Sequence, residues 1–269
     1  MTRPSDPPPP PAERPDDLKR QLRRMTRRGI AFGGLATLAG YGAWRWLGTA
    51  PEVGMLRSPL RRILELDEAV GRAGFRPGRM SRTYAASLAG MPRVNGRYGV
   101  DLNLDLARWR LHVEGPAGKK ALTLDEVKAF PKSEVTTELR CIEGWSQVVT
   151  WGGTRLADLA SASGLACRDG QPGGPLPERA DLLPYAALTT PDGTYFVGLD
   201  IASALHPQTL LCYEMNGEPL TGPHGAPLRL AITVKYGIKS LKQVGTLRFG
   251  DERPADFWAL KGYDWYAGL

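Results

Sequence analysis

The chain contains few cysteines and histidines and none of the common nucleotide-binding motifs. Three cysteines and three histidines occur among 269 residues, and no two cysteines have the spacing of a zinc site. Neither a GxGxxG nor a Walker sequence is present, which argues against a nucleotide-dependent enzyme. The sequence also shows no internal repeat. Its length suits one substantial domain with a smaller addition.

Three is an odd number of cysteines, so at least one thiol has no disulfide partner within the chain. A disulfide between Cys167 and Cys212 is open at this stage, and it would leave Cys141 free. A free thiol outside the cytoplasm is prone to oxidation unless it is buried or bound to a ligand. The third cysteine therefore needs its own explanation.

The positive charge of the chain is concentrated at its N-terminus. The net charge is +7, and residues 1–28 contain eight Lys and Arg against four Asp and Glu, so about +3 remains for everything after them. A nucleic-acid-binding protein normally carries its basic residues on the folded domain. We therefore expect no nucleic-acid partner.

The chain lacks a hydrophobic run long enough for an ordinary transmembrane helix. The uncharged run Gly29–Trp44 has 16 residues, fewer than the roughly 20 apolar residues that a spanning helix needs. Residues 1–25 form a tail rich in proline and arginine that we expect to be disordered. Arg27 and Arg28 directly precede the apolar run, a pattern typical of a twin-arginine signal.

Residues 26–50 are thus predicted to direct export to the periplasm by the twin-arginine route. Gly48-Thr49-Ala50 has the small-x-small pattern of a cleavage site. Alternatively, Trp44 and Trp46 would suit an uncleaved anchor at a membrane interface. An amphipathic or buried helix of the mature fold is the third alternative, and all three stay open.

The remaining chain alternates between short helical and short strand patterns. Residues 51–90 are predicted to form a connecting arm with a helix stop at Gly74. From residue 91 onward strands predominate, with short helices near Leu124 and Leu156. Asn216-Gly217 is a strong hairpin signal. Many short strands without a βαβ rhythm predict an α+β domain over residues 91–269.

The stretch TELRCIEGWSQVVTWGG (Thr137–Gly153) places Cys141 at the end of a predicted strand. A cysteine in this position is often a small buried hydrophobe. As a nucleophile it would need a general base, and the chain has only His112, His206 and His224 as histidine candidates. As a thiolate it would be a good ligand for a soft metal.

The segment PLTGPHGAPLRLAITVKYGIKSLKQV combines glycine-rich turns with His224, Arg229, Lys235, Lys239 and Lys242. Glycines that bring backbone amides close together, next to Arg and Lys, are a common way of holding a phosphate. The alternative is a solvent-exposed strand face that carries ordinary surface charges.

Taken together and in this order, LRCIEGWSQVVTWGG, HGAPLRL and KYGIKSLKQV resemble the sulfite oxidase family of molybdopterin enzymes. The likeness runs from about Met91 to the C-terminus, including GYDWYAGL, and it is strongest to the bacterial periplasmic branch of protein-methionine-sulfoxide reductases. The resemblance implies a sulfite oxidase-type molybdopterin-binding fold and a molybdenum-molybdopterin cofactor. It also implies two-electron oxygen-atom transfer, above all the reduction of a sulfoxide or a related S- or N-oxide.

By the same resemblance, Cys141 is the catalytic thiolate ligand to molybdenum. The residues that match cofactor-binding positions of the family are Asn95, Tyr98, Gly99, Thr189, His224, Arg229, Ser240, Leu241 and Lys242. Two of these differ from the reductase branch, which has asparagine in place of His224 and glutamate in place of Gly99. Trp145, Trp151 and Tyr236 are candidates for the substrate mouth.

The residues that follow Cys141 bear on the substrate. Animal and plant sulfite oxidases have arginines there that help to bind sulfite, whereas this chain has Glu143, Trp145 and Ser146. An acidic side chain near the metal would repel a doubly charged anion. We therefore expect a sulfoxide substrate, with sulfite oxidation on the same fold as the alternative. A hydrolase that uses Cys141 with His224, and a non-catalytic binding module, are further alternatives.

The resemblance also leads to expectations about partners. The chain has no haem-binding module and lacks the length for the family's C-terminal dimerisation domain, so we expect a monomeric catalytic domain. Electrons would come from a membrane haem protein or a quinol-linked donor.

Overall fold

The computed structural model describes residues 15–53 and 55–269. These residues divide into two units, which we describe separately. The first comprises the chain up to Glu52 together with Arg57–Pro59, and the second comprises Val53–Leu56 and Leu60–Leu269. Most of the tail predicted over residues 1–25 lies outside the described residues.

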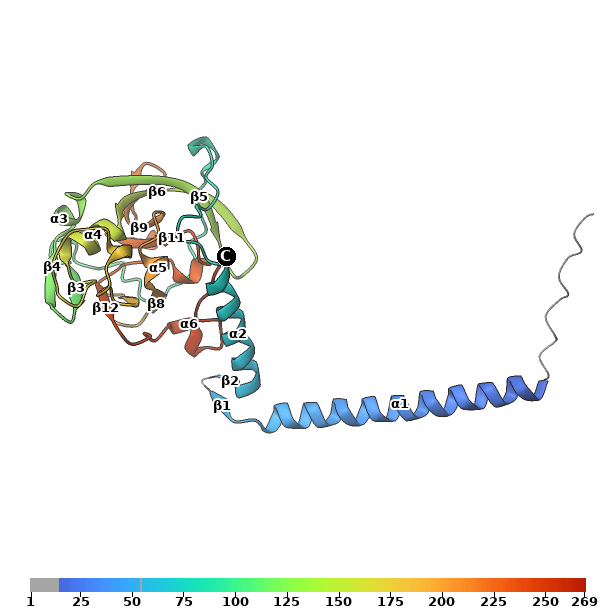
Figure 1. Ribbon diagram of the computed structural model, residues 1–269. Helices are drawn as coiled ribbons and strands as arrows, with labels where there is room; N and C mark the ends of the chain where they lie inside the picture. The colour runs from blue at the N-terminus through green and yellow to red at the C-terminus, as the bar shows by residue number, and fades with distance from the viewer. Residues whose placement is uncertain (1–14, 54) are drawn as a thin grey trace, which may run out of the picture. The chain divides into compact units, whose positions relative to one another are not determined.

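The long helix α1 (Pro15–Thr49) makes up most of the first unit (Figure 1). It begins before the predicted tail ends, so residues 15–25 are helical in the structure rather than disordered. The reason is local, because this stretch is rich in Leu, Lys, Arg and Gln, which are good helix formers, and a proline suits the first helical position. The predicted signal segment continues the same helix.

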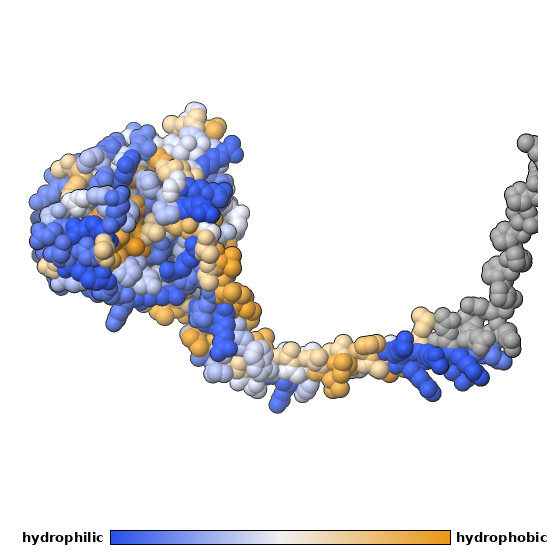
Figure 2. Space-filling view, in the orientation of Figure 1, coloured by the Kyte–Doolittle hydropathy of each residue, from blue (hydrophilic) through white to orange (hydrophobic). Residues whose placement is uncertain are grey.

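The side chains of α1 change character along its length. Figure 2 shows a strongly hydrophilic stretch followed by a hydrophobic one. Ile30, Phe32, Leu35 and Leu38 of the hydrophobic stretch are exposed. In the described part of the chain, no helix combines the length and the hydropathy that crossing a membrane requires.

After α1 the chain forms short strands and helices, largely in the order expected from the sequence. They are β1 (Glu52–Val53), β2 (Leu56–Arg57), α2 (Ser58–Gly74), β3 (Leu111–Gly115), β4 (Gly118–Leu122), α3 (Leu124–Lys128), β5 (Lys132–Arg140), β6 (Ser146–Arg155), α4 (Leu156–Ser163), β7 (Tyr185–Thr189), β8 (Phe196–Asp200), α5 (Ile201–Ala204), β9 (Thr209–Met215), β10 (Glu218–Pro219), β11 (Arg229–Ile232), β12 (Thr246–Gly250) and α6 (Phe257–Leu260). The predicted α+β class is therefore confirmed.

Two five-stranded sheets form the framework of the second unit. In one sheet the order is β10-β9-β6-β5, and β11 also pairs with β9. In the other the order is β4-β3-β12-β7-β8. Strands β3 and β12 are parallel, whereas the other neighbours are antiparallel. Strands β5 and β6 form a long hairpin, and Cys141 lies in the turn that joins them.

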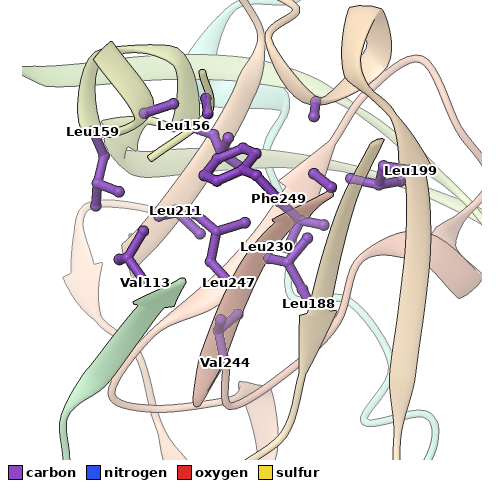
Figure 3. Packing of buried hydrophobic residues seen from close by; sticks show 14 of the residues in the cluster. Val113, Leu156, Leu159, Leu188, Leu199, Leu211, Leu230, Val244, Leu247 and Phe249 are labelled. Atoms are coloured by element: carbon purple, nitrogen blue, oxygen red, sulfur yellow. The ribbon is translucent and has the colours of Figure 1, made fainter. Parts of the chain in front are cut away.

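The main hydrophobic core combines both sheets with α4 (Figure 3). Its members include Val113, Leu188, Leu247 and Phe249 of one sheet, Leu211 and Leu230 of the other, and Leu156 and Leu159 of α4. Alternate residues of a strand point to opposite faces of its sheet. Thus Leu211 of β9 joins this core, whereas Leu210 joins a second cluster around Trp151. Burial on both faces explains the apolar run Leu210–Tyr213 within β9.

The predicted hairpin turn at Asn216-Gly217 is confirmed between β9 and β10. Asn216 has a φ of 54° and Gly217 a φ of 83°, and two positive φ angles are the mark of a type I′ turn. The side-chain oxygen of Asn216 also accepts the amide of Thr150 at 2.9 Å. The predicted helix stop at Gly74 is confirmed at the end of α2, and Gly164 ends α4 in the same way.

The disulfide that the sequence left open does not form, because all three cysteines are free thiols. Cys167 belongs to the main core and Cys212 to the second cluster. Burial raises the pKa of the Cys212 thiol to about 12, so this thiol stays protonated and unreactive. Cys141 alone among the three is partly exposed.

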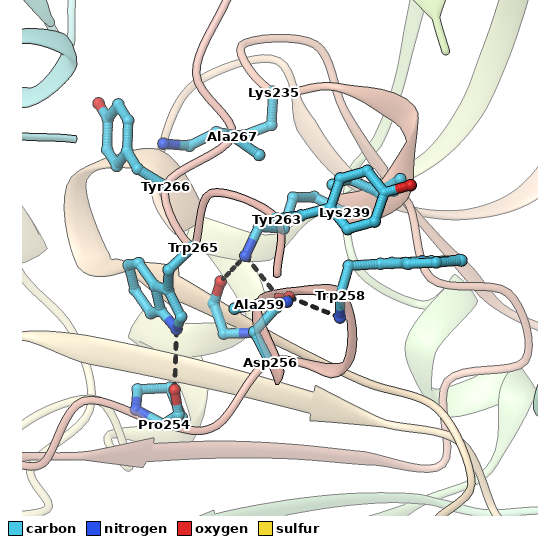
Figure 4. A network of polar contacts seen from close by, with 12 residues as sticks. Lys235, Lys239, Pro254, Asp256, Trp258, Ala259, Tyr263, Trp265, Tyr266 and Ala267 are labelled. Carbon is cyan, nitrogen blue, oxygen red and sulfur yellow. Dashed lines mark hydrogen bonds and ion pairs between the residues drawn. The ribbon is translucent and has the colours of Figure 1, made fainter. Parts of the chain in front are cut away.

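A buried ion pair fastens the loop after β11 to the C-terminal region. Lys239 Nζ lies 2.6 Å from Asp256 Oδ2 and donates to the carbonyl of Gly198 at 2.9 Å (Figure 4). Asp256 also caps α6 by accepting the amides of Trp258 and Ala259. The two charged side chains are only 1% and 2% exposed, and a charge so deeply buried needs its partner.

We expect Asp256→Ala to lower the free energy of unfolding by about 3–5 kcal/mol, because it leaves the buried ammonium of Lys239 without its counter-charge. Urea unfolding followed by circular dichroism measures this change. The double variant Lys239→Met with Asp256→Asn removes both charges and keeps a capping side chain. Its free energy of unfolding should fall by less than half as much as that of Asp256→Ala. A loss below about 1 kcal/mol for Asp256→Ala would contradict the importance of the pair.

Candidate functional site

One cavity of about 280 Å³ gathers most of the residues that the sequence singled out. Its walls come from the segment before β3, the β5–β6 turn, the loops on both sides of β11 and the C-terminal region. Seven of the ten predicted site residues line it: Asn95, Tyr98, Cys141, His224, Arg229, Ser240 and Lys242.

The β5–β6 hairpin presents Cys141 to this cavity. The Cys141 amide donates to the carbonyl of Trp145 at 2.9 Å, and the amide of Gly144 donates to the Cys141 carbonyl at 3.1 Å. These two bonds fix a tight turn at the end of a rigid pair of strands. The thiol is partly exposed on the cavity wall, so it is accessible to a ligand.

Asn95 connects this thiol to an acidic side chain. The Asn95 Nδ2 atom lies 3.8 Å from Cys141 Sγ and donates to Glu143 Oε2 at 3.0 Å. The Trp145 indole donates to the same carboxylate oxygen at 3.2 Å, and the Arg93 guanidinium lies 5.9 Å from the centre of the Trp145 ring. An amide N–H directed at the sulfur stabilises a thiolate and fixes its orientation.

Arg229, at the start of β11, is a buried cation on the cavity wall. Its Nη1 atom donates to the carbonyl of His224 at 2.9 Å, and its guanidinium centre lies 4.5 Å from the centre of the Trp151 ring. Its Nε atom is buried without a hydrogen-bond partner among the described residues. A buried donor without an acceptor is costly, so this arginine is set up for one more acceptor.

Lys242 is the second cation of the cavity. Its Nζ atom donates to the carbonyls of Asn95 at 2.7 Å and Pro223 at 2.9 Å, both neutral acceptors. Burial, followed by repulsion from Arg229, lowers the pKa of Lys242 to about 8. Burial likewise lowers the pKa of Arg229 to about 10. Two desolvated cations held by neutral acceptors favour an anionic ligand.

His224 and Ser240 complete this part of the wall. Burial, with smaller effects of Arg229 and Lys242, lowers the pKa of His224. The ring is therefore neutral near pH 7 and keeps one N–H donor. The Ser240 carbonyl accepts from Arg229 Nη2 at 3.4 Å, which ties the loop after β11 to the start of that strand.

Three aromatic residues of the cavity wall were missed by the sequence analysis: Tyr195, Trp258 and Tyr263. The Trp258 indole donates to the Tyr195 hydroxyl at 3.0 Å, and this hydroxyl donates to the carbonyl of Ile238 at 2.6 Å. The rings of Trp258 and Tyr263 meet edge to face at 5.1 Å. For Trp258 and Tyr263 the only sequence signal is the aromatic density of FWALKGYDWY, which is equally typical of a hydrophobic core, and Tyr195 lies outside this stretch.

Three predicted cofactor residues do not line the cavity: Gly99, Thr189 and Leu241. Leu241 is fully buried in the main core, and Thr189 pairs with Thr246 within its sheet. At Gly99 a side-chain carbon would lie 2.4 Å from Thr190 Cγ2, so no larger residue fits. Their contacts to a cofactor stay predictions.

Two lysines of the predicted basic segment also lie away from the cavity. Lys235 and Lys239 are each paired with a buried aspartate and do not reach the cavity. Of the three aromatic candidates for the mouth, Trp145 lines the cavity, whereas Trp151 is buried in the second cluster. Tyr236 lies outside the cavity wall.

Comparison with known proteins identifies the family. The family model described as "Oxidoreductase molybdopterin binding domain" matches residues 98–258, which is more than half of the chain. The chain belongs to this family. This molybdopterin-binding oxidoreductase is 30% identical over 251 residues to a putative protein-methionine-sulfoxide reductase subunit, YedZ1, of Azospira oryzae. The matched stretch covers 91% of this chain and 87% of that protein.

Other relatives match over a shorter stretch. The oxidoreductase is 34% identical over 157 residues to the protein-methionine-sulfoxide reductase catalytic subunit MsrP of Xanthomonas campestris, over 58% of this chain and 49% of that protein. It therefore spans about half the length of that relative. Among solved structures, the sulfane dehydrogenase SoxCD from Paracoccus pantotrophus matches 56% of this chain and 40% of its own, with a TM-score of 0.46 and 18% identity.

The residues of the cavity fit a molybdopterin. The unpartnered Arg229 Nε and the Lys242 ammonium suit the anionic phosphate of a pterin. Within the described residues, no group of three or more His, Cys, Asp or Glu could hold a metal ion. A metal carried by the cofactor would need only one thiolate from the protein, and Cys141 is the thiol on this wall.

We expect sulfate binding to the cofactor-free protein to weaken above a pH of about 8, because Lys242 then loses its proton. The sign follows from the lowered pKa, since an ordinary lysine keeps its charge up to about pH 10. Sulfate does not change its own charge in this interval. The rise in Tm that sulfate causes, measured between about pH 7 and 9, reports its binding.

The matched variant is Lys242→Met, which should bind sulfate more weakly and with little pH dependence in the same interval. If the variant and the wild type lost binding in parallel as the pH rises, the role given to Lys242 would be wrong.

Proposed function

We propose that this oxidoreductase is a molybdenum-dependent reductase that removes an oxygen atom from a sulfoxide, namely methionine sulfoxide within a protein, or from a related S- or N-oxide. The observation that carries the proposal is the accessible thiol of Cys141 on the same cavity wall as the uncompensated cations Arg229 and Lys242. The names of the relatives, which are protein-methionine-sulfoxide reductase subunits, support the substrate class.

In this proposal Cys141 is the protein ligand to molybdenum, since a thiolate suits a soft metal. Arg229, Lys242 and His224 hold the anionic end of the pterin, with Ser240 beside them. The other predicted contacts are Asn95, Tyr98, Gly99, Thr189 and Leu241. When bound, the cofactor supplies two-electron redox chemistry, and the chain supplies binding, orientation and electrostatics.

The rest of the wall favours a neutral substrate that contains sulfur. Trp145, Trp258 and Tyr263 line the cavity, and aromatic rings make favourable contacts with sulfur. Glu143 lies two residues after Cys141 and faces the same cavity, so its negative charge repels a sulfite dianion. A sulfoxide carries no net charge and avoids this repulsion. The wall thus supports sulfoxide reduction over sulfite oxidation.

We expect the native protein to contain about one molybdenum per chain and Cys141→Ser to contain little, with sulfoxide reduction at least about 100-fold slower, because the metal loses its protein ligand. Metal and pterin analysis, together with dye-driven turnover, measures both effects. Cys167→Ala, which removes a thiol from the hydrophobic core, should keep its molybdenum.

Equal molybdenum content and unchanged activity in Cys141→Ser would refute the ligand assignment. Turnover of sulfite that outpaces dye-driven reduction of sulfoxides would favour the sulfite oxidase alternative. Activity in metal-free protein would favour a cysteine-dependent hydrolase, although the described residues show no hydrogen bond between Cys141 and His224.

We propose further that the protein is exported to the periplasm by the twin-arginine route, with α1 either cleaved or kept as an anchor. The pair Arg27 and Arg28 is exposed on α1, directly before the exposed apolar run. In this location a membrane haem protein or a quinol-linked donor supplies the electrons, and the catalytic domain acts as a monomer.

Arg27→Lys with Arg28→Lys should leave folded protein in the cytoplasm, because the export route reads the arginine pair itself. Cell fractionation followed by immunoblotting measures the distribution. Arg23→Lys with Arg24→Lys makes the same chemical change earlier in the helix and should be exported normally. Undiminished export of the first variant would show that the targeting proposal is wrong.

A further inference from the structure

A second and larger cleft, of about 590 Å³, lies apart from the cofactor site. It is formed by the end of α2, the segment that follows it, the end of β5 and the C-terminal residues of the described chain. Figure 1 shows the end of α2 and the C-terminus beside β5. Nothing in the proposed chemistry uses this cleft.

The two cavities share strand β5 as their common wall. Leu139 and Cys141 line the cofactor cavity, whereas Glu138 and Arg140 line the second cleft. This division follows from the alternation of side chains along a strand. The loop after β11 approaches from the cofactor side, where a side-chain carbon on Gly237 would lie 3.2 Å from the Arg140 carbonyl oxygen. A molecule bound in the second cleft would therefore contact Arg140, which directly precedes Cys141 in the sequence.

The second cleft is lined by four arginines: Arg76, Arg79, Arg82 and Arg140. Two of its three side-chain carboxylates are engaged. Glu138 accepts Arg140 Nε at 2.8 Å, and Asp264 accepts the amides of Tyr266 and Ala267. The third, Asp67, is exposed and has no hydrogen-bond or ion-pair partner among the described residues.

The other three arginines of the cleft are exposed. Arg76, Arg79 and Arg82 have no carboxylate within ion-pair distance among the residues that the structure describes. They thus give the cleft a positive rim.

These arginines are displayed from a firmly held backbone. The Arg79 carbonyl contacts His206 Nε2 at 3.2 Å, and the Ser81 amide donates to Gln208 Oε1 at 2.7 Å. The Tyr84 amide donates to the carbonyl of Thr136 in β5 at 3.0 Å. His206 and Gln208 are themselves buried. The segment is thus a fixed part of the surface, which suits docking of a partner without a large rearrangement.

The proposed reaction requires an electron donor. A sulfoxide takes up two electrons and two protons, its S–O bond breaks, and a thioether and water leave. Two reduced one-electron donors become oxidised for each sulfoxide. A substrate carried on a protein would have to approach the mouth of the cofactor cavity, so a donor that acts while this substrate is bound would need another face of the domain.

We propose that the arginine-lined second cleft docks the acidic face of a one-electron redox protein, which delivers electrons across β5 to the centre held by Cys141. This inference rests on the proposed reductase function. The partner is defined by its chemistry: a carboxylate-rich surface around an exposed redox centre, complementary to the positive rim. Such complementary charges steer encounter and fix orientation, and they weaken as salt rises.

Binding to a plant-type ferredoxin, an acidic one-electron carrier, tests the proposal directly. The full chain loaded with cofactor is titrated with ferredoxin at low and high salt, with basic cytochrome c as the oppositely charged probe. We expect ferredoxin to bind at low salt and cytochrome c to bind far more weakly. Arg76→Glu with Arg79→Glu should weaken ferredoxin binding at least about tenfold.

The matched control is Arg108→Glu with Arg155→Glu. These two arginines are exposed and lie outside both cavities, so this variant makes the same change in net charge away from the cleft. Its affinity for ferredoxin should stay within about twofold of the wild type. Equal weakening in both double variants, or no binding of ferredoxin by the wild type, would overturn the docking site.

Turnover separates this inference from the function on which it rests. The cleft variant should reduce sulfoxide normally with methyl viologen, a small dye, and at least about tenfold more slowly with ferredoxin. If the wild type reduces no sulfoxide with either donor, the reductase function is refuted. The ferredoxin titration then still shows independently whether the cleft is a docking site. A cleft variant as fast as the wild type with ferredoxin refutes the docking site alone.

Discussion

Two cations that have no counter-charge among the described residues determine which ligands the cofactor cavity favours. Arg229 is buried and Lys242 partly so, and the acceptors around them are neutral carbonyls. Placing such charges out of water is costly. Lys235 and Lys239 of the same segment are each matched with an aspartate. The segment therefore contains two cations that are paired with aspartates and two that are not, and an anionic cofactor would stabilise the folded chain by binding to the second pair.

The sheet that contains β5, β6, β9 and β11 brings a thiol to these cations. Cys141 lies in the turn at one end of the β5–β6 hairpin, and Arg229 begins β11 in the same sheet. Continuous pairing from β5 through β6 and β9 to β11 fixes both positions on one framework. A site built on strand ends is held more precisely than one built on loops alone, which suits a metal that must receive electrons without changing its ligand.

The sequence was most informative where function depends on short motifs and local geometry. The motifs singled out Cys141, Arg229 and Lys242, which line one cavity in the structure, and the Asn216-Gly217 turn follows from backbone preferences alone. The inward orientation of Lys239 was not predictable, because Asp256 lies in a distant segment that only the fold brings near. The aromatic wall was missed for the same reason. The prediction for residues 15–25 failed for the opposite reason. The proline-rich sequence before them suggested disorder, but their own helix-forming residues place them in α1.

The cavity thus has two electrostatic ends, and their difference suits the proposed pair of an anionic cofactor and a neutral substrate. Near Arg229 and Lys242 an anion replaces lost hydration and supplies the missing acceptor. Near Cys141 the ionisable group is Glu143, held by Asn95 and the Trp145 indole. A second anion entering there would face this carboxylate as well as Cys141, the proposed ligand to molybdenum. Discrimination between sulfoxide and sulfite therefore needs no dedicated binding group, because the charge at this end already disfavours the dianion.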